Sequence, residues 1–180
     1  SICLLHTLLQ IKERNPNKIE QLVVLHFNHG TREECAEEEN LVRGLCSQLG
    51  LEIKVIKHKD FSLEESNFEQ RARQWRLAEI QKLIRSNDVV YQGHHIDDSY
   101  EWWLLQCFKS GEKTLGIPHT NGVLRRPFLC VTKEQIYQQA KREGLSYRED
   151  SSNSDSRFER NYLRKNVIPP IARKFPKYLK

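Results

Sequence analysis

The chain has 180 residues, a net charge of +5, 38% hydrophobic residues and 29% charged residues, which fits one ordinary globular domain with many exposed charges. No apolar run approaches the roughly 18 residues needed to cross a bilayer, so we expect no membrane span. The five cysteines form no C-x-x-C pair, which argues against a disulfide framework and against zinc or iron–sulfur sites built from closely spaced cysteines. Reduced thiols of this kind are typical of a cytoplasmic protein.

The first half of the sequence alternates between helical and extended patterns. Apolar residues recur at helical spacing after Ser1, and that helix should end before Pro16, because the residue before a proline avoids the α region. Short apolar runs indicate buried strands. The helices are predicted at residues 2–15, 33–49 and 67–85, and the strands at 21–27, 51–58 and 88–92. The apolar face predicted for the helix at 33–49 consists of Leu41, Val42, Leu45, Cys46 and Leu49.

A further helix follows the third strand, with a predicted apolar stripe of Tyr100, Trp103, Leu104, Cys107 and Phe108. The alternating order predicts parallel strands joined by crossover helices. The expected fold class is therefore α/β, with a doubly wound, mostly parallel sheet of Rossmann-like type.

The last third is basic and has a different pattern. Residues 119–180 carry 14 Lys+Arg against 6 Asp+Glu, whereas residues 1–118 carry 15 against 18. This segment contains an Asn121-Gly122 turn, an edge-like strand in "VLRRPFLCV", and a helix at 132–142 with Thr132 as N-cap and Gln135 completing a capping box. A basic end indicates a polyanion partner, although a solvated basic tail has the same composition.

Two polar turns come directly after predicted strands. They are "HFNHG" at residues 26–30 and "GHHIDD" at residues 93–98. In doubly wound sheets, ligands bind beyond the carboxyl ends of the strands, so we expect both turns to flank one crevice.

The second turn and the start of its helix allow three interpretations. It could be a solvated acidic helix start with incidental histidines, because a helix N-terminus favours anions. It could be a transition-metal site made by His94, His95, Asp97 and Asp98. It could also bind a nucleotide or a cationic substrate, since Asp98 and Glu101 stand on one face, and Mg²⁺ is commonly held by phosphates with one carboxylate.

Two arginine patterns are also candidates for anion contacts. Arg73 and Arg76 stand three positions apart on a predicted helix. They could bind a phosphate or carboxylate between them, or they could be solvated surface side chains. Near the C-terminus, basic residues interleave with Phe158 and Tyr162, which suits a phosphate backbone or a plain basic helix. These basic residues are Arg157, Arg160, Arg164 and Lys165.

Taken together, five segments resemble the bacterial tRNA(Ile)-lysidine synthetases, which belong to the N-type ATP pyrophosphatase (PP-loop) group. The resemblance covers nearly the whole chain. The segments, in chain order, are LHFNHGTREECAEEENLVRGLCSQLGL, NFEQRARQWR, GHHIDDSYEWW, RRPFLCVTKEQI and YREDSSNSDSRFERNYLRKNVIPP.

The resemblance implies a ligase that uses ATP and Mg²⁺ to adenylate C2 of the wobble cytidine in tRNA(Ile) with a CAU anticodon. The amine of free L-lysine then displaces AMP to form lysidine. It also implies a PP-loop domain, expected at residues 1–118, followed by the end of the catalytic domain and a tRNA-facing basic helical segment at 119–180. A homodimer is a further possibility.

The resemblance assigns candidate roles to individual residues. Asp98 and Glu101 would hold lysine and organise the reaction, with Arg73 as a third catalytic residue. Ser1 matches the last serine of the family's S-G-G-x-D-S phosphate loop, and we expect the rest of that loop upstream. The residues expected at the nucleotide are Ser1, Asn28, His29, Gly30, Gly93, His94 and His95. The residues expected at the tRNA are Arg126, Arg157, Arg160, Asn161, Arg164 and Lys165.

Two other functions compete with this reading. A PP-loop tRNA thiolase is one, although thiolases related to cytidine 2-thiolation use C-x-x-C cysteines. A non-catalytic tRNA-binding relative is the other. One local departure is Trp102, which stands where the family's H-x-D-D-x-x-E-T motif has a small hydroxyl residue.

Overall fold

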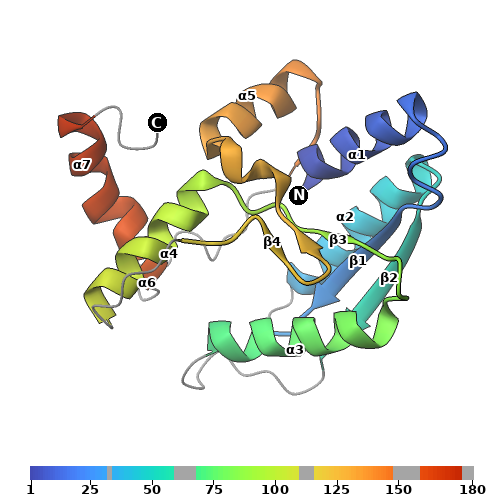
Figure 1. Ribbon diagram of the computed structural model, residues 1–180, viewed down its shortest axis with the longest axis horizontal. Helices are drawn as coiled ribbons and strands as arrows, with labels where there is room; N and C mark the ends of the chain where they lie inside the picture. The colour runs from blue at the N-terminus through green and yellow to red at the C-terminus, as the bar shows by residue number, and fades with distance from the viewer. Residues whose placement is uncertain (32–33, 59–67, 110–115, 148–158, 176–180) are drawn as a thin grey trace. The chain divides into compact units, whose positions relative to one another are not determined.

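A computed structural model describes residues 1–31, 34–58, 68–109, 116–147 and 159–175 of the chain (Figure 1). The chain divides into two compact units, one of residues Leu9–Asp88 and one of Ser1–Leu8 with Val89–Lys180. The first helix, α1 (Ile2–Arg14), ends before Pro16 as predicted. Residues before and after position 118 therefore belong to the same compact unit. The boundary predicted at position 118 marks a difference in net charge and in expected function, and as a functional boundary it stays a prediction.

The unit Leu9–Asp88 contains the predicted parallel strand pair. Strand β1 (Val23–Asn28) pairs with β2 (Glu52–Lys57), in a register that places Val23 opposite Glu52. The pair is joined by helix α2 (Glu34–Gln48), which contacts both strands. Parallel neighbours require such a crossover connection.

Helices cover both faces of this strand pair. The Asn28 side chain reaches Glu39 of α2, whereas the ring of Phe27 meets Trp75 of helix α3 (Phe68–Leu83) at a centroid distance of 5.6 Å. Neighbouring strand residues point to opposite faces of a sheet. Helices α2 and α3 therefore lie on opposite faces, which is the doubly wound layering predicted from the sequence.

The buried face of α2 agrees only in part with its predicted apolar face. Its buried residues are Cys35, Glu39 and Cys46, whereas Leu41 is 44% exposed. The helix thus turns a carboxylate toward the sheet, and the prediction for Leu41 was wrong.

The second unit contains a small mixed sheet. Strand β3 (Val90–Tyr91) pairs in parallel with β5 (Leu124–Arg125), and β4 (Thr120–Asn121) pairs with β5 in antiparallel fashion. Strand β5 is therefore central among these three strands. The prediction of an edge strand was wrong because β5 is hydrogen-bonded to a strand on each side.

Helix α4 (Ile96–Lys109) packs against the 3₁₀ turn η1 (Pro127–Cys130) and helix α6 (Glu159–Tyr162). Its buried residues are Glu101 and Leu104, while Phe108 is 67% exposed. The predicted apolar stripe was therefore wrong in part, because the inward face carries a charged residue. Helix α6 continues through a π-helical segment, η3 (Leu163–Val167), into α7 (Ile168–Lys174).

Helix α5 (Lys133–Arg142) starts and ends on local signals. The hydroxyl of Thr132 accepts from the backbone N–H of Gln135, and the Gln135 side chain accepts from the Thr132 N–H, which confirms the predicted capping box. At the other end Gly144 has φ +63, and the next N–H donates to the carbonyl of Ala140. Within the described ranges, no helix has the length and apolarity needed to span a membrane.

Candidate active site

The start of α4 is closed by one of its own carboxylates. The backbone N–H of His95 donates to Oδ2 of Asp98 at 3.0 Å, three residues further on. This is the return contact of a capping box, in which a side chain satisfies a free N–H at the helix start. One oxygen of Asp98 is thereby held at the backbone, and its other oxygen is available to side chains.

Asp97 connects two helices instead of facing the other acids. Its Oδ2 accepts from the backbone N–H of Lys133 at 2.8 Å, at the start of α5, and lies 3.2 Å from Nδ1 of His95. Burial raises the pKa of Asp97, but the contacts with His95 and the Lys133 N–H outweigh it and leave the pKa below its ordinary value. Asp97 is therefore an ionised structural link between α4 and α5.

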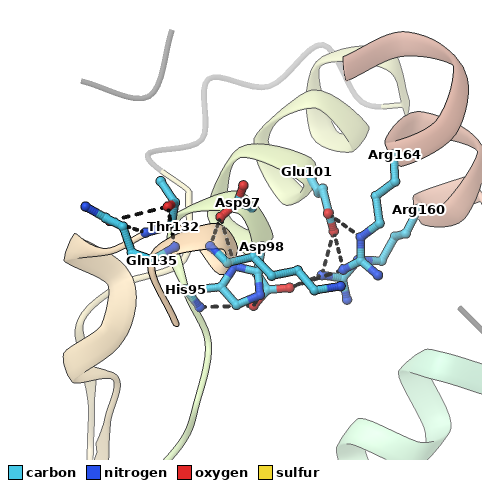
Figure 2. A network of polar contacts seen from close by, with 9 residues as sticks. His95, Asp97, Asp98, Glu101, Thr132, Gln135, Arg160 and Arg164 are labelled. Carbon is cyan, nitrogen blue, oxygen red and sulfur yellow. Dashed lines mark hydrogen bonds and ion pairs between the residues drawn. The ribbon is translucent and has the colours of Figure 1, made fainter. Parts of the chain in front are cut away.

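Glu101 and Asp98 form an acidic pair that two arginines contact (Figure 2). Glu101 is only 2% exposed. Arg164 donates to both of its carboxylate oxygens, from Nε to Oε1 and from Nη2 to Oε2, the latter at 2.8 Å. Nη2 of Arg160 lies 3.2 Å from Oε2 of Glu101 and 3.3 Å from Oδ1 of Asp98. Nη2 of Arg164 is also 3.3 Å from Oδ1 of Asp98. We call Arg160 and Arg164 the arginine pair.

The two pairs balance each other in charge. A buried carboxylate is costly unless it is ion-paired and hydrogen-bonded, and a bidentate guanidinium meets both needs. Burial lowers the pKa of Arg164, but the bond and charge of Glu101, with the charges of Asp98 and Asp97, raise it above the ordinary value. The cluster therefore combines two anions and two cations on the facing sides of α4 and α6–η3.

The described residues lend no support to the transition-metal interpretation. Within those ranges, no three His, Cys, Asp or Glu side chains gather in a way that could hold a metal ion. His94 and His95 are half-buried at the start of α4. His95 is occupied with its neighbours, since its Nε2 lies 3.4 Å from Oδ2 of Asp98.

The turn after β1 is held by hydrogen bonds at several points. Oδ1 of Asn28 accepts from the Gly30 N–H at 2.8 Å, and the Asn28 carbonyl accepts from the His58 N–H at 3.0 Å. Gly30 has φ +65, and a Cβ there would stand 3.1 Å from the carbonyl oxygen of His58. Both the left-handed backbone and the close approach favour glycine.

His29, the middle residue of this turn, lies among aromatic rings. Its ring is 5.2 Å from that of Trp75 and 6.0 Å from that of Phe68. Burial, followed by the nearby charges of Arg76 and His58, lowers the pKa of His29 to about 4. The imidazole is therefore neutral at pH 7 and can offer one donor and one acceptor.

The other predicted site residues occupy varied positions. Arg73 is exposed on α3. A Cβ at Gly93 would stand 3.4 Å from Cα of Ser1, so these two backbones lie close together. Lys165 is exposed and Asn161 is buried. Arg157 lies outside the described residues.

Arg126 is a correction to the predicted tRNA contacts. It is 2% exposed, and its guanidinium donates to Oε1 of Gln92 at 3.1 Å and to the carbonyl of Pro118 at 2.7 Å. A guanidinium buried in this way ties the β4–β5 region to the β3 strand end and does not present itself to a phosphate backbone.

The structure brings four predicted residues together, namely Asp98, Glu101, Arg160 and Arg164. The sequence reading assigned the acids to lysine and the arginines to tRNA, and it missed that they contact each other. Arg160 and Arg164 stand four positions apart and Asp98 and Glu101 three, so each pair shares a helix face, but this spacing does not show that the two faces meet. That the two turns flank one crevice, and that the arginine pair meets tRNA, stay predictions.

Comparisons with known proteins place these features in a family. The PP-loop domain family matches residues 1–171. A tRNA(Ile)-lysidine synthase of Legionella pneumophila (strain Lens) is 32% identical over 176 residues, covering 94% of this chain and 40% of that protein. The namesake from Persephonella marina is 34% identical over 173 residues, covering 92% and 38%. The one from Enterococcus faecalis is 32% identical over 187 residues, covering 99% and 40%.

The chain thus spans about two fifths of the length of these curated relatives. Among solved structures, the U34-tRNA thiolase NcsA from Methanococcus maripaludis with its 4Fe–4S cluster matches with a TM-score of 0.62 and 16% identity. The match covers 87% of this chain and 57% of that chain, and at this identity it shows the fold alone. On the extent of the family match and the shared α/β fold, the chain belongs to the PP-loop domain family.

Proposed function

We propose that the chain is the catalytic part of an ATP-dependent tRNA(Ile)-lysidine synthase, a ligase that forms a carbon–nitrogen bond. The observation that carries the proposal is the acidic pair at the start of α4, in a PP-loop chain whose curated relatives bear that name. The identity of about one third extends over more than nine tenths of this chain in these relatives.

In the proposed reaction, the C2 oxygen of the wobble cytidine attacks the α-phosphate of ATP and releases diphosphate. The amine of lysine then forms a bond to C2 as AMP leaves. Adenylation converts a poor leaving group into a good one, and carboxylates suit the binding and deprotonation of an amine.

The charges of the cluster suit a free amino acid. Lysine at neutral pH carries ammonium groups and a carboxylate, and the cluster offers carboxylates and guanidinium groups as partners for both. Each Asp98 and Glu101 oxygen that faces the cluster contacts Arg160 or Arg164. We propose that an ammonium group binds there by replacing one of these guanidinium contacts. The arginine pair would then be released toward an anion, such as the lysine carboxylate or a tRNA phosphate.

We propose that the adenosine of ATP binds at the turn Asn28–Gly30. Gly30 permits the left-handed backbone and the close approach of the His58 carbonyl that shape this turn, and the neutral His29 suits contact with an uncharged base. By family resemblance, further nucleotide contacts are proposed for Ser1, Gly93, His94 and His95. Mg²⁺ would be carried mainly by the phosphates, which is how this ion is commonly held. Arg73, exposed on α3, would contact anionic groups of the reaction.

The proposed macromolecular partner is tRNA(Ile) with a CAU anticodon, in the cytoplasm. Lys165, which is exposed beside the arginine pair on η3, is the clearest described candidate for a phosphate contact. Arg160 and Arg164 would join it on the same helical segment, whereas Asn161 is buried there. A homodimer is the proposed assembly.

Replacement of Asp98 by Asn in the full-length protein tests the proposal. The change removes one charge while leaving an oxygen that can accept from the His95 N–H. We expect lysine transfer to tRNA to fall about 100-fold or more, the scale of a lost acid–base group. ATP–diphosphate exchange in the presence of tRNA should persist, because adenylation precedes lysine attack.

The matched control is Glu159→Gln, which removes an exposed acid on α6 that pairs with Lys109 of α4 at 2.5 Å. Its lysine transfer should equal that of the unmodified protein. If Asp98→Asn keeps full transfer activity, or if both variants lose it to the same degree, the proposed role of the acidic pair is wrong.

A further inference from the structure

Glu39 is a buried carboxylate that the proposed reaction does not use. It lies on α2, is 6% exposed, and faces the end of β1. Oε1 accepts from Nε of Arg43 at 3.0 Å, and Oε2 lies 2.9 Å from Nζ of Lys57. The same Oε2 accepts from Nδ2 of Asn28 at 2.9 Å.

These contacts keep Glu39 ionised. The bonds from Lys57 and Asn28 lower its pKa to about 2, against a smaller opposing effect of burial and with a further lowering by Arg43. An ionised carboxylate accepts hydrogen bonds and cannot donate one. Glu39 therefore presents only an acceptor to Asn28 at neutral pH.

Both ends of the Asn28 side-chain amide are hydrogen-bonded. On one side Glu39 requires the NH₂ group, and the carbonyl of Cys35, 3.4 Å from Nδ2, has the same requirement. On the other side the Gly30 N–H, 2.8 Å away, requires the oxygen. A flipped amide would lose all of these bonds, so only one orientation of Asn28 satisfies its neighbours.

This orientation fixes the turn. Oδ1 of Asn28 holds the Gly30 N–H while the Asn28 carbonyl holds the His58 N–H, so the backbone is fixed at both ends of the turn. His29 is the residue between these two anchors. A change at Glu39 can reach the turn through the Asn28 side chain, and a second route runs through Lys57, which precedes His58.

We propose that Glu39 is a positioning residue for the adenine nucleotide: it orients the Asn28 amide and thereby sets the turn Asn28–Gly30 against which the nucleoside binds. The inference rests on the proposed binding of ATP at this turn. Glu39 does not itself contact the nucleotide, and the hydrogen-bond direction between Glu39 and Asn28 carries the effect.

The test reverses that hydrogen bond in the full-length protein. Asn28→Asp places two carboxylates against each other, and Glu39→Gln replaces a side chain that only accepts by an amide that can also donate. In the double variant, the glutamine amide introduced on α2 can donate to the aspartate introduced at the end of β1. The other oxygen of that aspartate still accepts from the Gly30 N–H. The exposed acid Glu34, on the same helix, supplies the matched control Glu34→Gln.

We expect Asn28→Asp to raise KM for ATP at least tenfold, the size of about one hydrogen bond to a charged group. The double variant should recover most of that loss, and Glu39→Gln alone should raise KM for ATP about threefold to tenfold. KM for lysine should stay unchanged in every variant, and Glu34→Gln should match the unmodified protein. Amide exchange at Gly30 should be faster in both single variants than in the double variant.

Equal increases in KM for ATP and for lysine, or a double variant no better than Asn28→Asp, would overturn the inference. If the unmodified protein transfers no lysine, the proposed function fails instead, and Gly30 amide exchange then decides alone whether Glu39 positions the turn. If Asn28→Asp does not fold, Glu39→Gln with unchanged KM for ATP and unchanged Gly30 exchange overturns it.

Discussion

Buried carboxylates define the chemistry of this chain at the scale of single residues. Glu39 and Glu101 each lie on an inward helix face, and each is held by two cationic side chains. Burying such ion pairs costs free energy, and removing one charged partner strongly destabilises the protein because the other charge is left buried without compensation. Replacement of either carboxylate should therefore change the stability of the protein as well as its function.

Replacement of Glu101 by Gln should lower the free energy of unfolding by about 1–3 kcal/mol, since it weakens hydrogen bonds between charged groups and leaves Arg164 less compensated. Urea unfolding with an unchanged m-value measures this loss. Glu159→Gln, at the exposed ion pair with Lys109, should change the free energy by no more than about 0.5 kcal/mol. Equal losses in the two variants would contradict the structural importance of the cluster.

His29 should make stability depend on pH. Its pKa is about 4 in the folded protein against an ordinary 6.5, so the unfolded chain takes up the proton first as pH falls. The associated stabilisation is complete above pH 6.5 and is lost as pH falls toward 4. Between these values the free energy of unfolding should fall less steeply in His29→Gln than in the unmodified protein, measured by urea unfolding at several pH values.

Parallel slopes for the two proteins would contradict that environment for His29.

Glu39 titrates over a lower pH range than His29, because its pKa is lowered from 4.5 to about 2. Its contribution is present above pH 4.5 and is lost as pH falls toward 2, so the two groups can be separated by pH.

At the scale of elements, local signals were sufficient where both partners lie close in sequence. The capping box of α5 and the end of α1 before Pro16 follow from short patterns. The parallel pair β1–β2 joins distant segments and followed from the alternating order of strands and helices. The inward faces of α2 and α4 did not follow, because Glu39 and Glu101 are stabilised by cations that the fold brings to them. Arg164 lies 63 positions after Glu101, a partnership that helical periodicity alone cannot reveal.

Loss of the α5 cap should have a defined local cost. Thr132→Ala removes the hydroxyl that accepts from the Gln135 N–H at 3.2 Å, and should lower the free energy of unfolding by about 1 kcal/mol. Thr132→Ser keeps the hydroxyl and should stay close to the unmodified protein. If Ala and Ser are equally stable by thermal or urea unfolding, the cap does not contribute as described.

At the scale of the whole molecule, charge asymmetry and family membership lead to the proposed tRNA partner. The charge excess of residues 119–180 was visible in the sequence, but which cations face outward was not. The structure distinguishes them, since Lys165 is exposed, Arg126 is buried, and the arginine pair is engaged with the acidic pair.

The salt dependence of tRNA binding should reflect this distinction. Lys165→Ala should weaken binding and reduce the slope of log affinity against log salt by about 1, as one phosphate contact is lost. Arg126→Gln should leave that slope unchanged while lowering the melting temperature, because its guanidinium is bonded inside the protein. A reduced slope for Arg126→Gln would restore Arg126 as an RNA contact.

Incubation of the full-length protein with ATP, Mg²⁺, radiolabelled lysine and transcripts of tRNA(Ile) with a CAU anticodon tests whether it is a lysidine-forming ligase. We expect ATP-dependent transfer of label to this tRNA, with one AMP released per lysine, and no transfer to a transcript whose wobble cytidine is replaced. Tight tRNA binding without lysine transfer, or transfer of sulfur in place of lysine, would contradict it.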